Sequence, residues 1–290
     1  MTGAPESGRA TKGGWSRVVG TLFNFATRHP IWTTILLSTL GIIVGIATLP
    51  FDDIRNLRTV NPHETAFMRE QIQLAAIRGV KLRKVQEWVP LDQIPKTLVD
   101  AVVVAEDGTF WSNSGFDWFE FQESFSRDLQ RFEFSRGAST ITQQLVKNLY
   151  LSSSKNPLRK AKEWILTWYA ARTLSKSRIL ELYLNVIEWG NGIYGAQAAA
   201  RYHFGKNVSD LTRDECARLA AIIPSPRRHR ADSDSPYVLR RSRIVIARMD
   251  ARGRPTPQPD ENFFEQDADS FSLVPDTSAI DSSSVKRDSL

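Results

Sequence analysis

Two adjacent carboxylates, Glu106 and Asp107, come directly after a mostly apolar run from Leu98 to Val104. The run predicts a buried helix, so both side chains would emerge from the edge of a core. A carboxylate in such a place can have a raised pKa, as a general acid or base requires. A pair of surface carboxylates at a helix end explains the same residues. This cluster alone favours the surface interpretation.

A second cluster, from Arg136 to Asn148, combines a glycine with a helix start. Thr140 and Gln143 have the spacing of a capping box, shortly after Gly137. The glycine permits close approach of a backbone, and the free N–H groups of a helix N-terminus suit an anion or a sugar. A well-capped amphipathic helix without a ligand is the simpler interpretation of the cluster by itself.

Two further clusters are basic or apolar. Arg159 and Glu163 are spaced i, i+4 and can pair on a helix surface, or Lys155, Arg159 and Lys160 can bind a diphosphate. The stretch from Lys176 to Asn185 carries apolar residues that we expect in the core rather than in a site.

The elements that must position these clusters have a mostly helical period. One apolar helix face is formed by Ile179, Leu180, Tyr183, Leu184 and Ile187. A capping box from Thr212 to Glu215 predicts the start of another helix, and no regular alternation of strands and helices is visible. The sequence therefore predicts a mainly α domain.

The segment from Ile31 to Leu49 contains no charged residue. As a helix, it would be about 28 Å long, close to the thickness of a bilayer's hydrocarbon core. A buried core helix would have an amphipathic stripe, and the apolar part of a signal peptide is usually shorter. We therefore expect one retained transmembrane anchor.

Charges that flank this anchor predict its orientation. Basic residues dominate before it, and Asp52 and Asp53 are the first charges behind it. The excess of positive charge places the N-terminus in the cytoplasm and the rest of the chain outside the cytoplasmic (inner) membrane, on its periplasmic or outer face. The preceding basic residues are Arg9, Lys12, Arg17 and Arg28.

Composition narrows the chemistry only slightly. A net charge of +6 suits nucleic acid, a membrane surface or phosphate-bearing substrates and does not choose among them. The single cysteine, Cys216, excludes an intrachain disulfide. The four histidines lack ligand spacing, so no metal-ligating residues are assigned.

The shifts in composition predict five parts of the chain. They are a cytoplasmic disordered tail (1–28), the transmembrane anchor (29–50), a juxtamembrane segment (51–87), the dense domain (88–250) and a second disordered tail (251–290).

In this order, the four clusters resemble the bacterial peptidoglycan glycosyltransferases, specifically the monofunctional biosynthetic kind. The matching motifs are ED-x-x-F with a later G-x-D (Glu106 to Asp117), G-x-S-T-I-x-Q-Q-x-x-K-N (Gly137 to Asn148), R-K-x-x-E (Arg159 to Glu163) and I-L-E-x-Y-L-N (Ile179 to Asn185). The resemblance extends from about Trp88 to Pro226. It implies a lysozyme-like glycosyltransferase domain behind one N-terminal transmembrane helix.

The resemblance also implies a reaction. Such enzymes polymerise lipid II into β-1,4 glycan strands at the outer face of the cytoplasmic membrane, for cell-wall synthesis. The equivalent of Glu106 is the base for the acceptor's 4-hydroxyl, which attacks C1 of the donor sugar with inversion and expels undecaprenyl diphosphate. The implied partners are lipid II, the growing glycan strand and the membrane, with cell-wall synthesis or division proteins as further candidates. Nucleic acid is not implied.

By motif position, Lys147, Lys155 and Arg159 would bind the diphosphate, and Glu163 would be a second catalytic residue that positions them or a divalent cation, Mg²⁺ or Mn²⁺. The sequence leaves that cation open. The rest of the implied substrate-binding set is Asp107, Ser139, Gln144 and Asn148.

Two departures from the family pattern affect this assignment. Asn113 stands where the family commonly has histidine, so that side chain can form hydrogen bonds but cannot titrate. Lys155 stands where arginine is common, which keeps the charge and loses the bidentate geometry.

Two alternatives remain at this stage. A lysozyme-like lytic enzyme also relies on one glutamate in a helical fold, but it releases no diphosphate and does not need the basic residues from Lys147 to Lys160. A catalytically inactive cell-wall scaffold has Asn113 as its only support.

Overall fold

Serine, threonine or asparagine side chains cap the N-termini of five α-helices in the described part of the chain. The computed structural model describes residues 27–113, 139–154 and 156–252. Thr140 accepts a hydrogen bond from the backbone N–H of Gln143, and Thr212 does the same for Glu215, so both predicted capping boxes are confirmed. Each such cap contributes about 1 kcal/mol to the stability of its helix.

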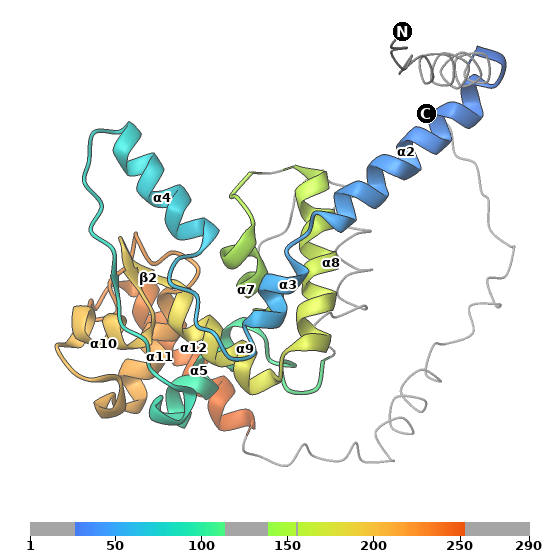
Figure 1. The fold of residues 1–290 in the computed structure, drawn as a ribbon. Coiled ribbons are helices and arrows are strands. Elements are labelled where there is room, and N and C mark those ends of the chain that lie inside the picture. The colour runs from blue at the N-terminus through green and yellow to red at the C-terminus, as the bar shows by residue number, and fades with distance from the viewer. Residues whose placement is uncertain (1–26, 114–138, 155, 253–290) are drawn as a thin grey trace, which may run out of the picture. The chain divides into compact units, whose positions relative to one another are not determined.

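The described ranges are mostly helical, which confirms the predicted mainly α class (Figure 1). The helices are α2 (Pro30–Ala47), α3 (Phe51–Asn56), α4 (Ala66–Ile77), α5 (Lys96–Glu106), α7 (Ile141–Tyr150), α8 (Pro157–Thr173), α9 (Lys176–Val186), α10 (Ala196–Phe204), α11 (Arg213–Ile222) and α12 (Pro236–Arg252), with the 3₁₀ turns η1 (Leu91–Gln93) and η2 (Val208–Asp210). The strands are β1 (Val85–Gln86), β2 (Glu188–Gly190) and β3 (Ile193–Tyr194).

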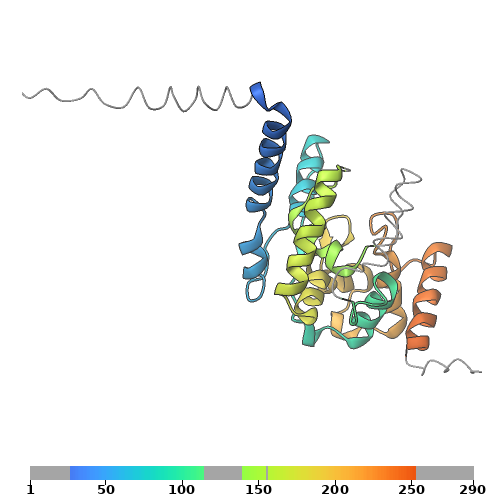
Figure 2. The same cartoon turned by 90° about the vertical axis from the view of Figure 1, so that its right-hand side faces the viewer.

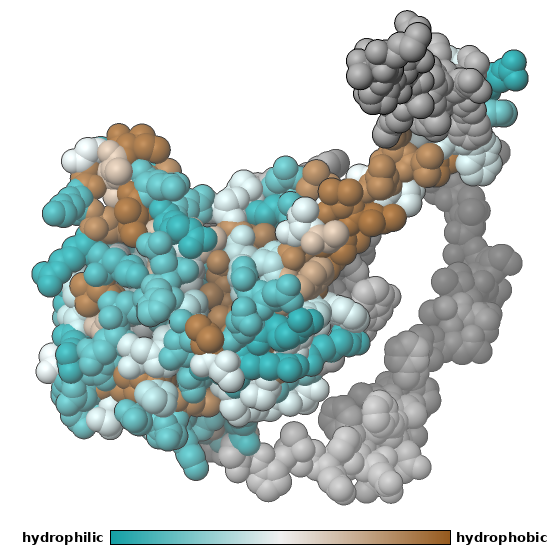
Figure 3. Space-filling view, viewed as in Figure 1, coloured by the Kyte–Doolittle hydropathy of each residue, from teal (hydrophilic) through white to brown (hydrophobic). Residues whose placement is uncertain are grey.

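The apolar helix α2 is long and apolar enough to cross a membrane, and none of its residues is buried. Figure 3 shows hydrophobic residues along its exposed surface. Transfer of such a surface from water into lipid is favourable, so α2 fits a single-pass anchor.

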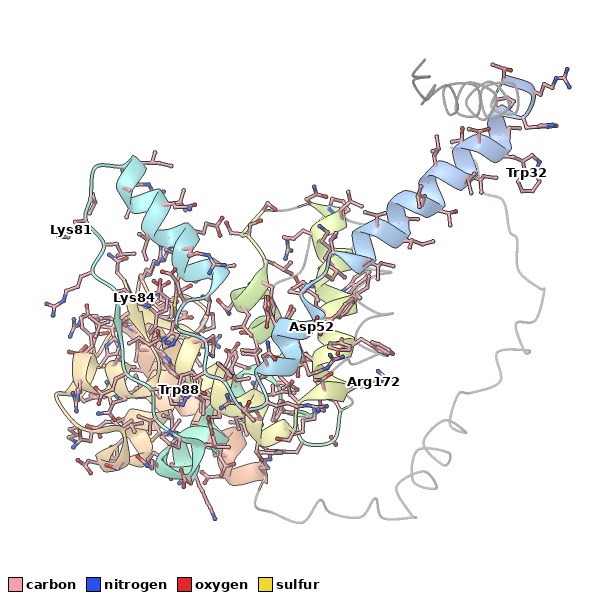
Figure 4. The ribbon with its side chains drawn as sticks, viewed as in Figure 1. Trp32, Asp52, Lys81, Lys84, Trp88 and Arg172 are labelled. Carbon is pink, nitrogen blue, oxygen red and sulfur yellow. The ribbon has the colours of Figure 1, made fainter. Side chains whose placement is uncertain are left out.

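Residues 51–87 contribute elements to the fold of the domain. Helix α3 packs on α8 and α4 packs on α7, while β1 pairs in parallel with β3. Figure 4 shows Lys81 and Lys84 on the segment that joins α4 to β1. This segment therefore bears charged side chains while its end joins the sheet.

Three short strands form one sheet within the described residues, in the order β1-β3-β2. The turn between β2 and β3 contains Gly192, whose φ is +76°. A Cβ at this position would lie 2.5 Å from the carbonyl oxygen of Arg83. Only glycine fits both the backbone angle and the close approach.

The core lies where α5 packs on α11 and where α7 packs on both α8 and α9 (Figures 1 and 2). Its largest fully buried side chains include Trp189, Tyr183 and Phe110, and Cys216 is buried as well. The described residues up to Met249 belong to one compact unit, and beyond them the structure describes only the last residues of α12. Most of the two predicted disordered tails therefore lies outside the described residues.

Candidate active site

Glu106 is the last residue of α5, and its carboxylate is held from one side. Gln144 of α7 donates from Nε2 to Glu106 Oε2 at 2.9 Å. The other oxygen, Oε1, is buried without a hydrogen-bond partner within the described part of the chain. Burial raises the pKa of Glu106, and the hydrogen bond from Gln144 and the positive charge of Arg241 oppose that rise. Such a carboxylate is a stronger proton acceptor than an exposed one.

The amide of Gln144 is itself fixed by three groups. Besides Glu106, its Nε2 lies 3.4 Å from the carbonyl oxygen of Ser139, and its Oε1 accepts the hydroxyl of Tyr183 at 2.9 Å. Tyr183 is on α9 and is fully buried. A carboxylate and a carbonyl only accept hydrogen bonds, so the NH₂ group must face them and the amide oxygen must face the tyrosine.

A cavity of about 290 Å³ opens beside Glu106. Ser139, Thr140 and residues Val104 to Thr109 line it together with Arg248 of α12. Arg248 also donates to the carbonyl oxygen of Val104 at 3.2 Å, so the C-terminal helix lies along the end of α5 (Figure 2). Glu106 therefore borders a space that a sugar hydroxyl can enter.

Asp107, unlike Glu106, has both oxygens engaged. Oδ2 accepts the backbone N–H of Ile141 at 3.0 Å, and Oδ1 accepts Nδ2 of Asn113 at 3.0 Å and the hydroxyl of Thr109 at 3.3 Å. Burial raises the pKa of Asp107, and these hydrogen bonds and Lys176 oppose the rise. Asp107 thus joins α5 to α7.

Asn113 has a defined structural partner on either side. Its Oδ1 accepts Lys176 Nζ at 2.7 Å while its Nδ2 donates to Asp107. Lys176 also lies over the ring of Phe110, with 4.5 Å between Nζ and the ring centroid. Asparagine at position 113 therefore forms hydrogen bonds to both neighbours although, unlike histidine, it cannot titrate.

The second predicted acid, Glu163 of α8, is buried between two cations. Arg159 Nη1 lies 2.7 Å from one carboxylate oxygen, and Lys160 Nζ hydrogen-bonds to the other. The Glu163 side chain is only 3% exposed and the Arg159 side chain 19% exposed. The two residues therefore pair as the sequence predicts, but not on the surface of the helix. Because one carboxylate meets two cations, the group keeps a positive charge.

Lys147 of α7 adds a third cation to this group. Partial desolvation by the surrounding protein lowers its pKa although the side chain reaches solvent, Glu163 raises it, and Arg159 and Lys160 lower it. Lys147 is three residues after Gln144, about 4.5 Å further along the helix axis. One turn of α7 therefore separates Gln144, the partner of Glu106, from Lys147. We define the cation cluster as Lys147, Arg159 and Lys160.

The residues present do not readily hold a divalent cation at Glu163. Both of its oxygens already accept hydrogen bonds from cationic side chains. Within the described ranges, no group of three or more His, Cys, Asp or Glu side chains is arranged to hold a metal ion.

The structure brings together most of the residues that the sequence singles out. Ser139 lines the cavity, Gln144 contacts Glu106, and Asn148 donates to the carbonyl oxygen of Gln144 at 2.8 Å, which is a contact within α7. Lys155 lies outside the described residues, as do Gly115, Asp117 and Gly137 of the motifs.

Sequence reasoning missed three side chains near the base. Tyr183 was expected in the core, where it is, but its hydroxyl belongs to the site. Tyrosine rather than phenylalanine at a fully buried position was the available signal, since a buried hydroxyl needs a partner. Arg241 and Arg248 of α12 gave no signal, because a basic helix surface is usually only solvated.

A buried glutamate beside a cavity, hydrogen-bonded to a glutamine that lies one helical turn before a lysine of a cation cluster, is an arrangement suited to acid–base chemistry on an anionic substrate. Comparison with known proteins agrees with this class of chemistry. Residues 73–250 match the family model described as Transglycosylase.

Several curated proteins called biosynthetic peptidoglycan transglycosylase are similar to the chain. That of Paraburkholderia xenovorans is 40% identical over 221 residues, which cover 74% of this chain and 92% of the relative. That of Nitrosospira multiformis is 40% identical over 65% of this chain and 82% of the relative, and that of Thiobacillus denitrificans is 48% identical over 58% and 72%. The chain therefore belongs to the transglycosylase family.

Proposed function

We propose that this protein is a peptidoglycan glycosyltransferase that polymerises lipid II into β-1,4 glycan strands and releases undecaprenyl diphosphate for cell-wall synthesis. One observation carries the proposal: α7 directs Gln144 to the buried base Glu106 and, one turn later, Lys147 to the cation cluster. A group that removes a proton and a group that stabilises an anion are thus held on one rigid element.

The base acts on the acceptor sugar. Ionised Glu106 accepts the proton of the acceptor's 4-hydroxyl while the oxygen of that hydroxyl attacks C1 of the donor. Oε1 is the oxygen with capacity to accept this proton, because Oε2 is held by Gln144. The attack comes from the face opposite the leaving group, so the configuration at C1 inverts.

The cation cluster acts on the leaving group. As the new O4–C1 bond forms, the bond between C1 and the diphosphate oxygen breaks and negative charge grows on that oxygen. Lys147, Arg159 and Lys160 stabilise the charge by hydrogen bonds and Coulombic attraction. We assign Lys155, from its place in the motif, to the same task. Glu163 holds Arg159 and Lys160 in position.

This cation cluster argues against a lytic enzyme. Cleavage of a glycan strand releases no diphosphate, so such an enzyme has no use for a cluster of three cations next to the helix that holds its glutamate. Asn113 no longer supports an inactive scaffold, because its contacts with Asp107 and Lys176 require no titrating group.

We further propose that α2 anchors the protein in the cytoplasmic (inner) membrane, with the N-terminus inside and the domain on the outer face. The apolar length of α2 and the basic residues before it support this topology. Cell-wall synthesis or division proteins are candidate partners at that face, next to lipid II and the growing glycan strand.

The test is incubation of the purified full chain with labelled lipid II, followed by sizing of the glycan products. We expect polymer from the wild type and a loss of at least about 100-fold in Glu106→Gln, because general-base catalysis contributes that much or more. The control is Glu87→Gln, which removes an exposed carboxylate paired with Arg201 and should keep full activity.

Polymer from Glu106→Gln at the wild-type rate would reject Glu106 as the base. Intact lipid II binding without polymer from either protein would favour the scaffold, and cleavage of preformed strands would favour the lytic enzyme. A chelator tests the divalent cation: loss of polymer that Mg²⁺ or Mn²⁺ restores would support it, and unchanged polymer would reject it.

A further inference from the structure

A hydrogen-bonded chain runs from the core to the proposed base. The Tyr183 hydroxyl donates to Gln144 Oε1 at 2.9 Å, and Gln144 Nε2 donates to Glu106 Oε2 at 2.9 Å. The three residues come from α9, α7 and α5 and are far apart in the sequence. Tyr183 is fully buried and does not line the cavity beside Glu106, so it has no direct access to a substrate there.

The amide at the middle of this chain has two orientations that differ in their effect on the base. With the NH₂ group toward Glu106, Gln144 stabilises the carboxylate form. With the amide oxygen toward Glu106, it would repel the carboxylate and favour the protonated acid. The Ser139 carbonyl, like the carboxylate, can only accept a hydrogen bond and so favours the first orientation. Tyr183 completes that orientation from the other side, because its hydroxyl donates to the amide oxygen, which would otherwise be buried without a donor.

We propose that Tyr183 is a positioning residue for the general base: its buried hydroxyl holds the Gln144 amide in the one orientation that keeps Glu106 ionised and aimed. The inference rests on the proposed function, in which Glu106 accepts a proton. It assigns a role in the reaction to a residue that packing alone would explain as part of the core.

Other charged groups near Glu106 do not replace this effect. Asp107 follows it on α5 with both oxygens engaged, and Arg241 of α12 attracts the ionised carboxylate through space. Arg248 of α12 donates to the Val104 carbonyl and not to the Glu106 carboxylate. Within the described part of the chain, Gln144 is the hydrogen-bond donor to that carboxylate, and Tyr183 supports it from behind.

The hydroxyl of Tyr183 also stays protonated while the base titrates. Burial raises the pKa of Tyr183 well above its ordinary range, and the negative charges of Glu106 and Asp107 raise it further. Tyr183 therefore remains a donor to Gln144, and within the chain of Tyr183, Gln144 and Glu106 the group that titrates is Glu106.

The experiment is a titration of the Glu106 carboxyl in the full chain in detergent micelles, read by infrared difference spectroscopy. The band that disappears in Glu106→Gln identifies the group. In Tyr183→Phe we expect the midpoint to move to higher pH by about one unit, as loss of one oriented hydrogen bond to a charged group produces. The acid limb of the pH–rate profile, where the rate falls as Glu106 becomes protonated, should move to higher pH by the same amount. At a fixed pH on this limb, kcat/KM should be about tenfold lower than in the wild type.

Two further variants separate positioning from packing. Gln144→Met removes the middle of the chain and should show the same shift with the hydroxyl still present. Tyr183→Phe in the Gln144→Met background should add no further shift, because Tyr183 acts through Gln144. Tyr194→Phe is the matched control: it removes a buried hydroxyl near Glu188 and Arg227, and should leave the midpoint unchanged.

An unshifted midpoint in Tyr183→Phe or in Gln144→Met would overturn the proposal, as would an additional shift in the double variant. The outcome is separable from that of the proposed function. A shifted carboxyl titration in a protein that makes no polymer would reject the proposed function and keep the positioning role. An active wild type with an unshifted titration in Tyr183→Phe would keep the proposed function and reject the positioning role.

Discussion

Asp107, the C-cap of α5, accepts the backbone N–H of Ile141 at 3.0 Å, and this hydrogen bond joins the end of α5 to the first turn of α7. The two helices meet here with Glu106 on one and Gln144 on the other. The distance between Glu106 and its donor Gln144 therefore depends on a carboxylate whose two oxygens both accept hydrogen bonds from the protein.

Replacement of Asp107 by alanine should destabilise the protein by about 2 kcal/mol, because the buried N–H of Ile141 and the amide of Asn113 lose their acceptor. Urea denaturation of the detergent-solubilised chain measures this. Asp100→Ala, an exposed change on the same helix, should cost far less. Equal losses in the two variants would show that the junction between α5 and α7 is not held by Asp107.

Glu106→Gln should unfold at a higher temperature than the wild type at neutral and alkaline pH. Burial raises the pKa of Glu106 in the folded state above its ordinary value of 4.5. The protonated Glu106 therefore contributes fully to the stability of the folded state below pH 4.5. This contribution is lost as the pH rises through the pKa that Glu106 has in the folded protein. Glutamine never ionises, so the variant escapes this loss.

Thermal unfolding of both proteins across pH 4 to 9 tests this expectation. The difference in unfolding temperature should vanish at the acid end and grow with pH. A variant that is less stable than the wild type at every pH would show that the carboxylate is not strained by its burial.

Glu163→Gln should destabilise the protein by roughly 2 kcal/mol, less than for a fully buried ion pair, because Arg159 and Lys160 are partly exposed. It should also reduce polymerisation, since the two cations then repel each other without a common partner. Asp214→Asn, which weakens an exposed ion pair with Arg218, is the control and should cost less than about 1 kcal/mol. Equal stability of the two variants, from chemical denaturation, would contradict a buried role for Glu163.

Arg241→Met should move the acid limb of the rate to higher pH, because the positive charge of Arg241 lowers the pKa of Glu106. We expect a loss of roughly threefold at a pH on that limb, since solvent and salt screen part of the interaction. Arg240→Met removes a neighbouring exposed charge from the same helix and should leave the profile in place. Identical pH–rate profiles for the two variants would show that the charge of Arg241 on α12 does not affect the pKa of Glu106.

The local features of this fold were predictable because they depend on neighbouring residues. The caps at Thr140 and Thr212 and the helix that carries Glu106 follow from spacing within a few positions. The mainly α class follows from the same periodicity. The contacts of Asp107 were not predictable in this way, since its partner Ile141 lies on another helix. The pairing of Glu163 with Arg159 follows from their spacing, but the burial of Glu163 does not.

The contribution of α12 lies beyond sequence reasoning for a different reason. Arg248 reaches the carbonyl of Val104 across 144 residues, and a basic amphipathic helix has no feature that predicts this contact. The hydroxyl of Tyr183 was visible in the sequence, but its partner Gln144 was not. The boundaries between the five predicted parts of the chain, the cation site and the assignment of Lys155 stay predictions.

The single turn of α7 between Gln144 and Lys147 has a consequence for how this enzyme can vary. Each residue advances an α-helix by about 100°, so one inserted residue between them would swing Lys147 away from Arg159 and Glu163 while Gln144 stayed on the base. Substitution can tune either end gradually. Insertion or deletion of one residue in this turn would at once separate the proposed site of proton removal, held by Gln144, from the proposed site of charge neutralisation, which contains Lys147.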